Sequence, residues 1–468
     1  MRHFDCIVIG SGPGGQKAAI QAAKLGRRVC VIEKSAAVGG AAINTGTIPS
    51  KALREAVLHL TGSNKRALFG ENSRMKRQIT IDDLIYVSQR VIHNELELVR
   101  EYFDRNNIEL IWGEAKFETP NMISVCKDGD TEHLSADKFV IAIGTRPAKP
   151  HTVPFDDKTI FCSDGLLKVG VLPKSMIVVG GGVIGTEYAC MMAALGVKVT
   201  LVEGRQEVLG FLDREIGEAL MYTMRRAGIT LRLGEKVARI EKLESTNGYN
   251  EPLVQAMLES GKMLKAQTLL YAVGRQGTTG LLAVDKAGIE ADDRQRLHVN
   301  EHYQTNVPHI YAVGDVIGFP ALASTAMEQG RLAACHAYGV PTHSVPELFP
   351  LGIYAIPEIS MVGKTEAQLT DAGIPYEAGI AEYRELARGQ LLGDEMGLLK
   401  LLIHQETHEI LGVHAIGTGA TELIHIGQVV MAYKGSIDFF INNVFNYPTL
   451  AEAYKVAALN GRNKLRHV

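Results

Sequence analysis

The sequence lacks most of the features that mark secreted, membrane or nucleic-acid-binding proteins. Its 468 residues include one tryptophan and only six cysteines, which are scattered so that no CxxC-type pair can form locally. The formal net charge at pH 7 is −3, which gives no electrostatic reason to expect nucleic acid or an anionic membrane as a partner. No apolar run approaches the roughly 18 residues of a membrane helix. The opening MRHFDCIVIG predicts a strand and not a leader peptide. We therefore expect a cytoplasmic protein with reduced, buried cysteines and no metal site.

The clearest positive feature is a unit that occurs twice. Residues 5–33 read DCIVIGSGPGGQKAAIQAAKLGRRVCVIE, and residues 175–203 read SMIVVGGGVIGTEYACMMAALGVKVTLVE. Each predicts a strand, a glycine-rich turn, an Ala-rich helix and a second strand that ends in glutamate. One GxGxxG motif is weak evidence, but two in complete βαβ context are strong evidence. The chain is therefore predicted to bind two dinucleotides.

The glycines of each unit have distinct expected roles. The first permits the tight turn, the second lets the backbone approach a pyrophosphate, and the third lets the helix pack closely on the strand. In chain order they are Gly10, Gly12 and Gly15, and then Gly180, Gly182 and Gly185.

The closing acids of the two units predict which ribose group each turn accepts. Glu33 and Glu203 are placed to accept hydrogen bonds from an adenosine ribose. Glu203 alone favours NAD, because a carboxylate repels a 2′-phosphate. Arg205 could offset that charge and admit NADP, or it could be only an exposed turn cation. Both interpretations stay open at this point.

Further segments complete an α/β organisation. FVIAIGTRP (139–147) and LLYAVGRQG (269–277) predict strands that close the two units. Residues 114–138 and 235–268 alternate polar and apolar positions and predict small β excursions. Past about residue 345 the pattern changes to strands and helices without a nucleotide turn, which indicates a third domain.

Several motifs carry a family resemblance over nearly the whole chain. GSGPGG, GTIPSK, AIGTRP, GGGVIGTEYA, AVGR, YAVGD and FNYPTLAEAYKVAALNG occur in the order found in the FAD-dependent pyridine nucleotide–disulfide oxidoreductases, which the sequence resembles. The resemblance implies two Rossmann-like domains, for FAD and NAD(P), plus a C-terminal α+β dimerisation domain. The expected boundaries are 1–150 with 275–345 for FAD, 151–274 for NAD(P) and 346–468 for the interface. It also implies a homodimer or higher homo-oligomer.

The resemblance also implies contacts to the cofactors. Asp315 matches an acid on the flavin ribityl chain, and Ala323 matches a backbone contact to the pyrimidine end. Lys51 matches a lysine beside the flavin and Glu187 the glutamate that pairs with it, although such residues are elsewhere usually just solvated. The remaining expected cofactor contacts are Gly40, Ala42, Ala115, Thr145, Val237, Gly274 and Arg275.

Two parts of the dithiol machinery of related disulfide reductases are missing. Ala42 and Thr47 stand at the two positions of the CxxxxC motif, and neither can form the thiolate that reduces a disulfide. Tyr447 stands where the HPTxxE pattern has histidine, with Glu452 at the acid position. The expected catalytic set is Lys51, Glu187, Thr47, Tyr447 and Glu452.

The resemblance is strongest to the Si-specific transhydrogenase branch of the family. It implies hydride transfer between NADPH and NAD⁺ through FAD, by a ping-pong scheme without a redox disulfide. NAD(H) and NADP(H) would be substrates. One alternative is an FAD-dependent NAD(P)H:quinone or dye reductase on the same scaffold. Another is an FAD-bound redox-sensing protein without catalytic activity.

Overall fold

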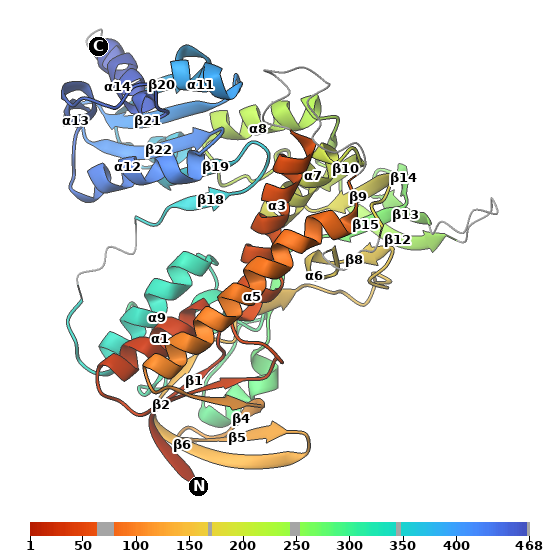
Figure 1. The fold of residues 1–468 in the computed structure, drawn as a ribbon, viewed down its shortest axis with the longest axis vertical. Coiled ribbons are helices and arrows are strands. Elements are labelled where there is room, and N and C mark those ends of the chain that lie inside the picture. The colour runs from red at the N-terminus through yellow and green to blue at the C-terminus, as the bar shows by residue number, and fades with distance from the viewer. Residues whose placement is uncertain (63–78, 167–170, 244–252, 343–347, 466–468) are drawn as a thin grey trace. The chain divides into compact units, whose positions relative to one another are not determined.

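The computed structural model describes residues 1–62, 79–166, 171–243, 253–342 and 348–465 (Figure 1). The chain forms two compact units. Unit 1 comprises residues 1–53, 85–148 and 274–346, and unit 2 comprises residues 54–84, 149–273 and 347–468. No helix within the described ranges is long and apolar enough to cross a membrane. The assignment of ligands to the sequence domains stays a prediction.

Unit 1 contains a seven-stranded sheet in the order β3-β2-β1-β6-β5-β4, with β17 also paired to β6. β1, β2, β3 and β17 run parallel to their neighbours, whereas β4, β5 and β6 form antiparallel pairs. β6 serves both arrangements because its first half pairs with β5 and its second half with β17. The strands are β1 (Arg2–Ile9), β2 (Val29–Glu33), β3 (Glu109–Trp112), β4 (Glu114–Thr119), β5 (Met122–Lys127), β6 (Asp130–Ile141) and β17 (Ile310–Ala312), with a separate antiparallel pair of β7 (Thr145–Pro147) and β16 (Arg275–Gly277).

The helices α1 and α9 of unit 1 lie side by side in close backbone contact (Figure 1). A Cβ on Gly330 of α9 would lie 2.0 Å from the carbonyl oxygen of Gly14 in α1, so only glycine allows this approach. Ala18, Ala19 and Ala22 of α1 are fully buried in the same core, which explains why this helix is rich in alanine. The helical segments are α1 (Pro13–Lys24), α2 (Gly40–Asn44), η3 (Thr279–Leu282), η4 (Val284–Ala287), η5 (Gly314–Ile317) and α9 (Ala323–Ala337), with α3 (Thr47–Thr61) and α5 (Ile81–Arg105) divided between the units.

Unit 2 contains a parallel five-stranded sheet in the order β11-β10-β9-β15-β8. A three-stranded antiparallel sheet, β12-β13-β14, forms the β excursion expected within 235–268. The elements are β8 (Ile160–Phe161), α6 (Ser163–Leu166), β9 (Ser175–Val179), α7 (Val183–Ala194), β10 (Lys198–Glu203), α8 (Arg214–Arg226), β11 (Thr230–Leu233), β12 (Val237–Leu243), β13 (Leu253–Leu258), β14 (Met263–Ala266) and β15 (Thr268–Tyr271).

The C-terminal part of unit 2 is an antiparallel sheet in the order β18-β19-β22-β21-β20. Alternation along β21 places Leu399 and Leu401 in the core with α12 and α14, and Lys400 on the opposite face. α8 packs against β22. The elements are β18 (Leu351–Ile353), β19 (Ile359–Gly363), α10 (Glu366–Asp371), β20 (Tyr376–Glu382), η6 (Tyr383–Glu385), α11 (Ala387–Leu392), β21 (Leu398–His404), β22 (Ile410–Ile416), α12 (Ala420–Ala432), α13 (Ile437–Asn442) and α14 (Glu452–Leu465). The predicted fold class is confirmed.

Candidate functional site

The first glycine-rich turn combines backbone crowding with an open approach to a helix end. Gly10 has a φ of +102°, and a Cβ on Gly15 would lie 2.0 Å from the Gly10 carbonyl oxygen. A Cβ on Gly12 would meet no atom of the described residues within 4 Å. Gly12 is also the N-cap of α1, and the first N–H groups of a helix have no intrahelical acceptors. The open space and these donors fit an anionic pyrophosphate.

The second turn repeats this geometry in unit 2. Gly180 has a φ of +106°, and a Cβ on Gly185 would lie 1.9 Å from the Gly180 carbonyl oxygen. Gly182 is the N-cap of α7, and a Cβ there would again meet nothing within 4 Å in the part of the chain that the structure describes. The two turns therefore agree in structure as well as in sequence.

Glu33 ends β2 with its carboxylate directed at the first turn. Its Oε2 accepts hydrogen bonds from the backbone N–H (3.1 Å) and the hydroxyl (2.5 Å) of Ser11, and its Oε1 accepts from the N–H of Ser35 (2.8 Å). A carboxylate oxygen has room for two donors, so Oε1 can still accept from a ribose hydroxyl. Gly40 lies beside the same turn, since a Cβ there would come within 3.0 Å of the Gly12 Cα.

Glu203 occupies the corresponding position in the second turn. Its Oε2 accepts from the Gly181 N–H (2.6 Å), and its Oε1 accepts from the N–H (2.9 Å) and Nε (3.2 Å) of Arg205. Burial acts to raise the pKa of Glu203, but hydrogen bonds from Arg205 and Gly181 outweigh it and lower the pKa below its usual value. Glu203 is therefore ionised at neutral pH. The Arg205 side chain pairs with it while remaining 60% exposed to solvent.

Three residues predicted to contact cofactors meet in unit 1. The Thr145 hydroxyl donates to Asp315 Oδ2 (3.0 Å) and accepts from Arg275 Nε (2.8 Å). Arg275 also donates to the Thr145 carbonyl (2.7 Å), and its Nε lies 3.8 Å from Asp315 Oδ2. The pairing of β7 with β16 brings Arg275 to Thr145, and η5 supplies Asp315. Arg275 thus lies with the proposed flavin ribityl acid, within unit 1.

The other expected cofactor contacts occupy varied positions. Ala115 is buried on β4 in the core of unit 1, so only its backbone is available to a ligand. Ala323 is the first residue of α9, at a helix N-terminus. Val237 begins β12, and Gly274 adopts a φ of +80° before β16.

The two positions that lack cysteine lie on consecutive helices, the short α2 and the start of the longer α3. Ala42 is half-buried within α2, and Thr47 is exposed at the start of α3. All six cysteines of the chain are free. Burial raises the pKa of the Cys190 thiol to about 11 and that of Cys6 to about 12, so neither forms a thiolate at neutral pH.

The remaining predicted catalytic residues are divided between the two units. Lys51 lies on α3 within unit 1, while Glu187 lies on α7 within unit 2 and is 3% exposed. The Glu187 Oε1 accepts from the backbone N–H of Tyr354 (2.8 Å). Tyr447 is 70% exposed, and Glu452 begins α14. The pairing of Lys51 with Glu187 stays a prediction.

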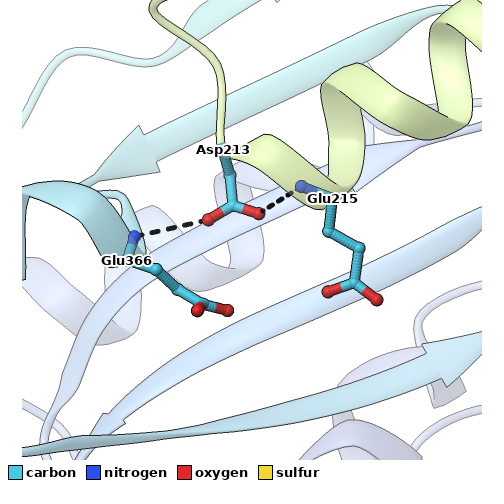
Figure 2. A group of neighbouring side chains, drawn as sticks. All are labelled: Asp213, Glu215 and Glu366. Carbon is cyan, nitrogen blue, oxygen red and sulfur yellow. Dashed lines mark hydrogen bonds between the residues drawn. The ribbon is translucent and has the colours of Figure 1, made fainter.

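A group of carboxylates in unit 2 has the spacing of a metal site. Asp213, Glu215 and Glu366 each place an oxygen within 4.8 Å of the others. Figure 2 shows the three neighbouring side chains. Lys400 is buried among them: its Nζ lies 2.8 Å from Asp213 and 3.0 Å from Glu215, and also contacts Glu366. The buried ammonium therefore supplies the positive charge that a metal ion would bring.

Sequence reasoning missed Ser11, Arg54 and Tyr354. Ser11 stands between two of the predicted turn glycines, so its proximity to the closing Glu33 could have been expected from the motif alone. Arg54 and Tyr354 had no comparable signal, because their contacts join distant segments: Arg54 donates to the carbonyl of Ala355, and the Tyr354 N–H donates to Glu187.

Comparisons with known proteins agree with this geometry. Residues 4–330 match the pyridine nucleotide-disulphide oxidoreductase family, and residues 349–458 match its dimerisation domain. The chain is 52% identical over 468 residues to a soluble pyridine nucleotide transhydrogenase of Mycobacterium bovis, covering 100% of this chain and 98% of that protein. A protein of the same name from Vibrio atlanticus is 47% identical, covering 99% of both. The Cu(II) complex of an HOCl-induced flavoprotein disulfide reductase from Escherichia coli has a TM-score of 0.87 at 26% identity, covering 98% of this chain and 99% of that one.

Proposed function

Since the chain belongs to the pyridine nucleotide-disulphide oxidoreductase family, we propose that it is an FAD-dependent enzyme that transfers a hydride between NADPH and NAD⁺, as a soluble pyridine nucleotide transhydrogenase. The observation that carries the proposal is the pair of matching dinucleotide turns, each with open space at its central glycine. Ala42 and Thr47 add that the positions of the family's redox cysteines hold no sulfur.

The residues of unit 1 fit FAD. The α1 N-terminus at Gly12 would bind the pyrophosphate and Glu33 the adenosine ribose. Asp315, held by Thr145 and Arg275, would bind the ribityl chain. When bound, FAD supplies the centre that accepts and returns the hydride.

The second turn would serve donor and acceptor nucleotides in succession. Gly182 and Glu203 form one dinucleotide turn in unit 2, so one nucleotide must leave before the next binds there. This arrangement supports the proposal of a ping-pong scheme. Lys51, paired with Glu187, would offset negative charge that the cofactor acquires between the two half-reactions.

The proposal that hydride transfer uses no dithiol relay has a direct test in electron counting. Anaerobic titration with dithionite should stop at two electrons per FAD, and no thiolate–flavin charge-transfer band should appear, because the chain places no thiol at positions 42 and 47. Uptake of four electrons per FAD would mean that two of the six cysteines form an active pair.

Arg205 is expected to bind the 2′-phosphate of NADP(H). Arg205→Ala should raise the Kd of NADPH about tenfold, the effect of losing one charge-assisted hydrogen bond, and change the Kd of NADH little. Titration of each nucleotide against the oxidised enzyme measures both constants. Arg214→Ala, which removes an exposed arginine at the start of α8, is the matched control. Equal weakening of both nucleotides by Arg205→Ala would contradict a role in phosphate recognition.

We further propose that the protein is a cytoplasmic homodimer. The match to a dimerisation domain over residues 349–458 supports this assembly. The residues near the closing motif leave large apolar side chains in solvent: Val444 is 95% exposed and Tyr447 is 70% exposed. A second copy would cover such a surface and bring residues 445–460 into the interface.

A further inference from the structure

One short segment of unit 2 is hydrogen-bonded to two helices through the backbone of two adjacent residues. The backbone N–H of Tyr354 donates to Glu187 Oε1 on α7 (2.8 Å). The carbonyl oxygen of Ala355, the next residue, accepts from Arg54 Nε on α3 (3.0 Å). The segment that follows β18 therefore joins the two helices that carry the predicted Lys51–Glu187 pair.

Arg54 contacts residues at both ends of the segment 354–358. Its Nη2 lies 3.5 Å from Glu358 Oε2, and its guanidinium lies 5.8 Å from the centre of the Tyr354 ring. Arg54 and Glu358 are both buried. A planar guanidinium with five N–H donors can reach a carbonyl and a carboxylate at once, whereas an ammonium acts as a single point charge. Removing Arg54 would leave a buried carboxylate and a buried carbonyl without this partner.

Burial raises the pKa of Glu358, and the positive charge of Arg54 opposes that rise. The ionised form of Glu358 is therefore stabilised by the positive charge of Arg54. Arg54 also contacts Glu55 Oε1 (2.7 Å), but that side chain is largely in solvent and contributes little to the position of the segment.

Arg54 follows Lys51 by three residues on α3, so the two side chains project from neighbouring positions on the same side of the helix. We infer that Arg54 is a positioning residue for hydride transfer, because it holds the Tyr354–Ala355 segment that in turn holds Glu187 and the helix of Lys51. The inference rests on the proposed function, in which Lys51 and Glu187 act as a pair beside FAD.

The first test compares Arg54→Met with Arg54→Lys. Arg54→Met should slow flavin reduction at saturating NADPH about tenfold, as misplacement of a catalytic group does, with FAD content and NADPH affinity nearly unchanged. Arg54→Lys should recover part of the rate, since an ammonium can still pair with Glu358. In FAD-free protein, hydrogen–deuterium exchange of the amides at residues 354–358 should be faster in Arg54→Met than in the parent. An unchanged rate together with unchanged exchange would overturn the inference.

A double-mutant cycle separates positioning from loss of stability. If Arg54 acts through Lys51, adding Arg54→Met to Lys51→Met should slow the reaction little further, whereas independent effects would multiply. Val413→Ala is the control for loss of stability. It should open a cavity in the core beside β22 of the same unit and lower the melting temperature. The inference is wrong if Val413→Ala slows flavin reduction as much as Arg54→Met does.

Glu358→Gln keeps the guanidinium and removes only the charge of its partner, so it should show the pattern of Arg54→Met more weakly. This variant keeps the inference testable if Arg54→Met does not fold. Slow reduction in Lys51→Met with normal reduction in both Arg54→Met and Glu358→Gln would overturn this inference alone. Normal reduction in Lys51→Met would instead remove the role of Lys51 from the proposed function.

Discussion

Gly12→Val should give a folded protein that has lost FAD, and Gly182→Val a folded protein that keeps FAD but is not reduced by NADPH or NADH. Both glycines have φ values that any residue adopts, −65° and −76°, and a Cβ at either position meets no atom of the described residues within 4 Å. The chain should therefore tolerate valine at both positions. A ligand pyrophosphate should not, because the side chain would occupy the space where it approaches the backbone.

The expected loss of affinity is at least about a hundredfold for each ligand, since roughly 3 kcal/mol of charge-assisted hydrogen bonding is lost and the side chain also excludes the pyrophosphate. FAD content by absorbance, melting temperature and reduction by each nucleotide measure the outcome. FAD-stripped parent protein is the correct stability reference for Gly12→Val, because bound ligand stabilises the folded state. Gly15→Val is the contrasting variant, since its Cβ would lie 2.0 Å from the Gly10 carbonyl oxygen and should disrupt the turn itself.

The pair of variants also assigns the ligands to the turns. Loss of FAD in Gly182→Val and retention in Gly12→Val would reverse the assignment. Full activity in both variants would reduce the two turns to structural βαβ connections.

Lys51→Met should slow both half-reactions by about a hundredfold while leaving nucleotide affinity nearly unchanged. The ammonium is proposed to act on charge that exists only during the reaction, and electrostatic groups of this kind contribute about 10²–10³ in rate. Methionine keeps the length and helix propensity of lysine, so α3 should be preserved. Stopped-flow measurement of flavin reduction by NADPH, and of reoxidation by NAD⁺, gives each half-reaction separately.

His59→Gln is a matched control for Lys51→Met, because it changes an exposed residue farther along the same helix. Its rates should equal those of the parent. A large increase in the NADPH Kd of Lys51→Met, with no change in the limiting rate, would make Lys51 a binding residue.

The nucleotide turns could be predicted from the sequence because short-range backbone geometry determines them. Gly10 and Gly180 need a positive φ, and Gly15 and Gly185 need the absence of a Cβ, whatever the rest of the chain does. The ends of the closing strands then place the acids next to their own turns. Here local sequence and tertiary structure depend on the same few residues.

The contacts around these turns could not be predicted in the same way. Arg275 lies in the LLYAVGRQG segment downstream of the second nucleotide turn, yet the β7–β16 pairing brings it to Thr145 in unit 1. Arg54 bonds a carbonyl 301 residues away. Such contacts depend on strand pairing and packing between remote segments, for which a single sequence carries no local signal.

The most direct test of the central claim is a double-mixing stopped-flow experiment. The enzyme is first mixed anaerobically with one equivalent of NADPH, and the resulting bleached flavin is then mixed with NAD⁺ or, separately, with a benzoquinone. Hydride exchange through FAD predicts that NAD⁺ restores the flavin absorbance at a rate no slower than steady-state turnover. Restoration by the quinone, with no response to NAD⁺, would contradict the transhydrogenase account and identify a quinone reductase instead.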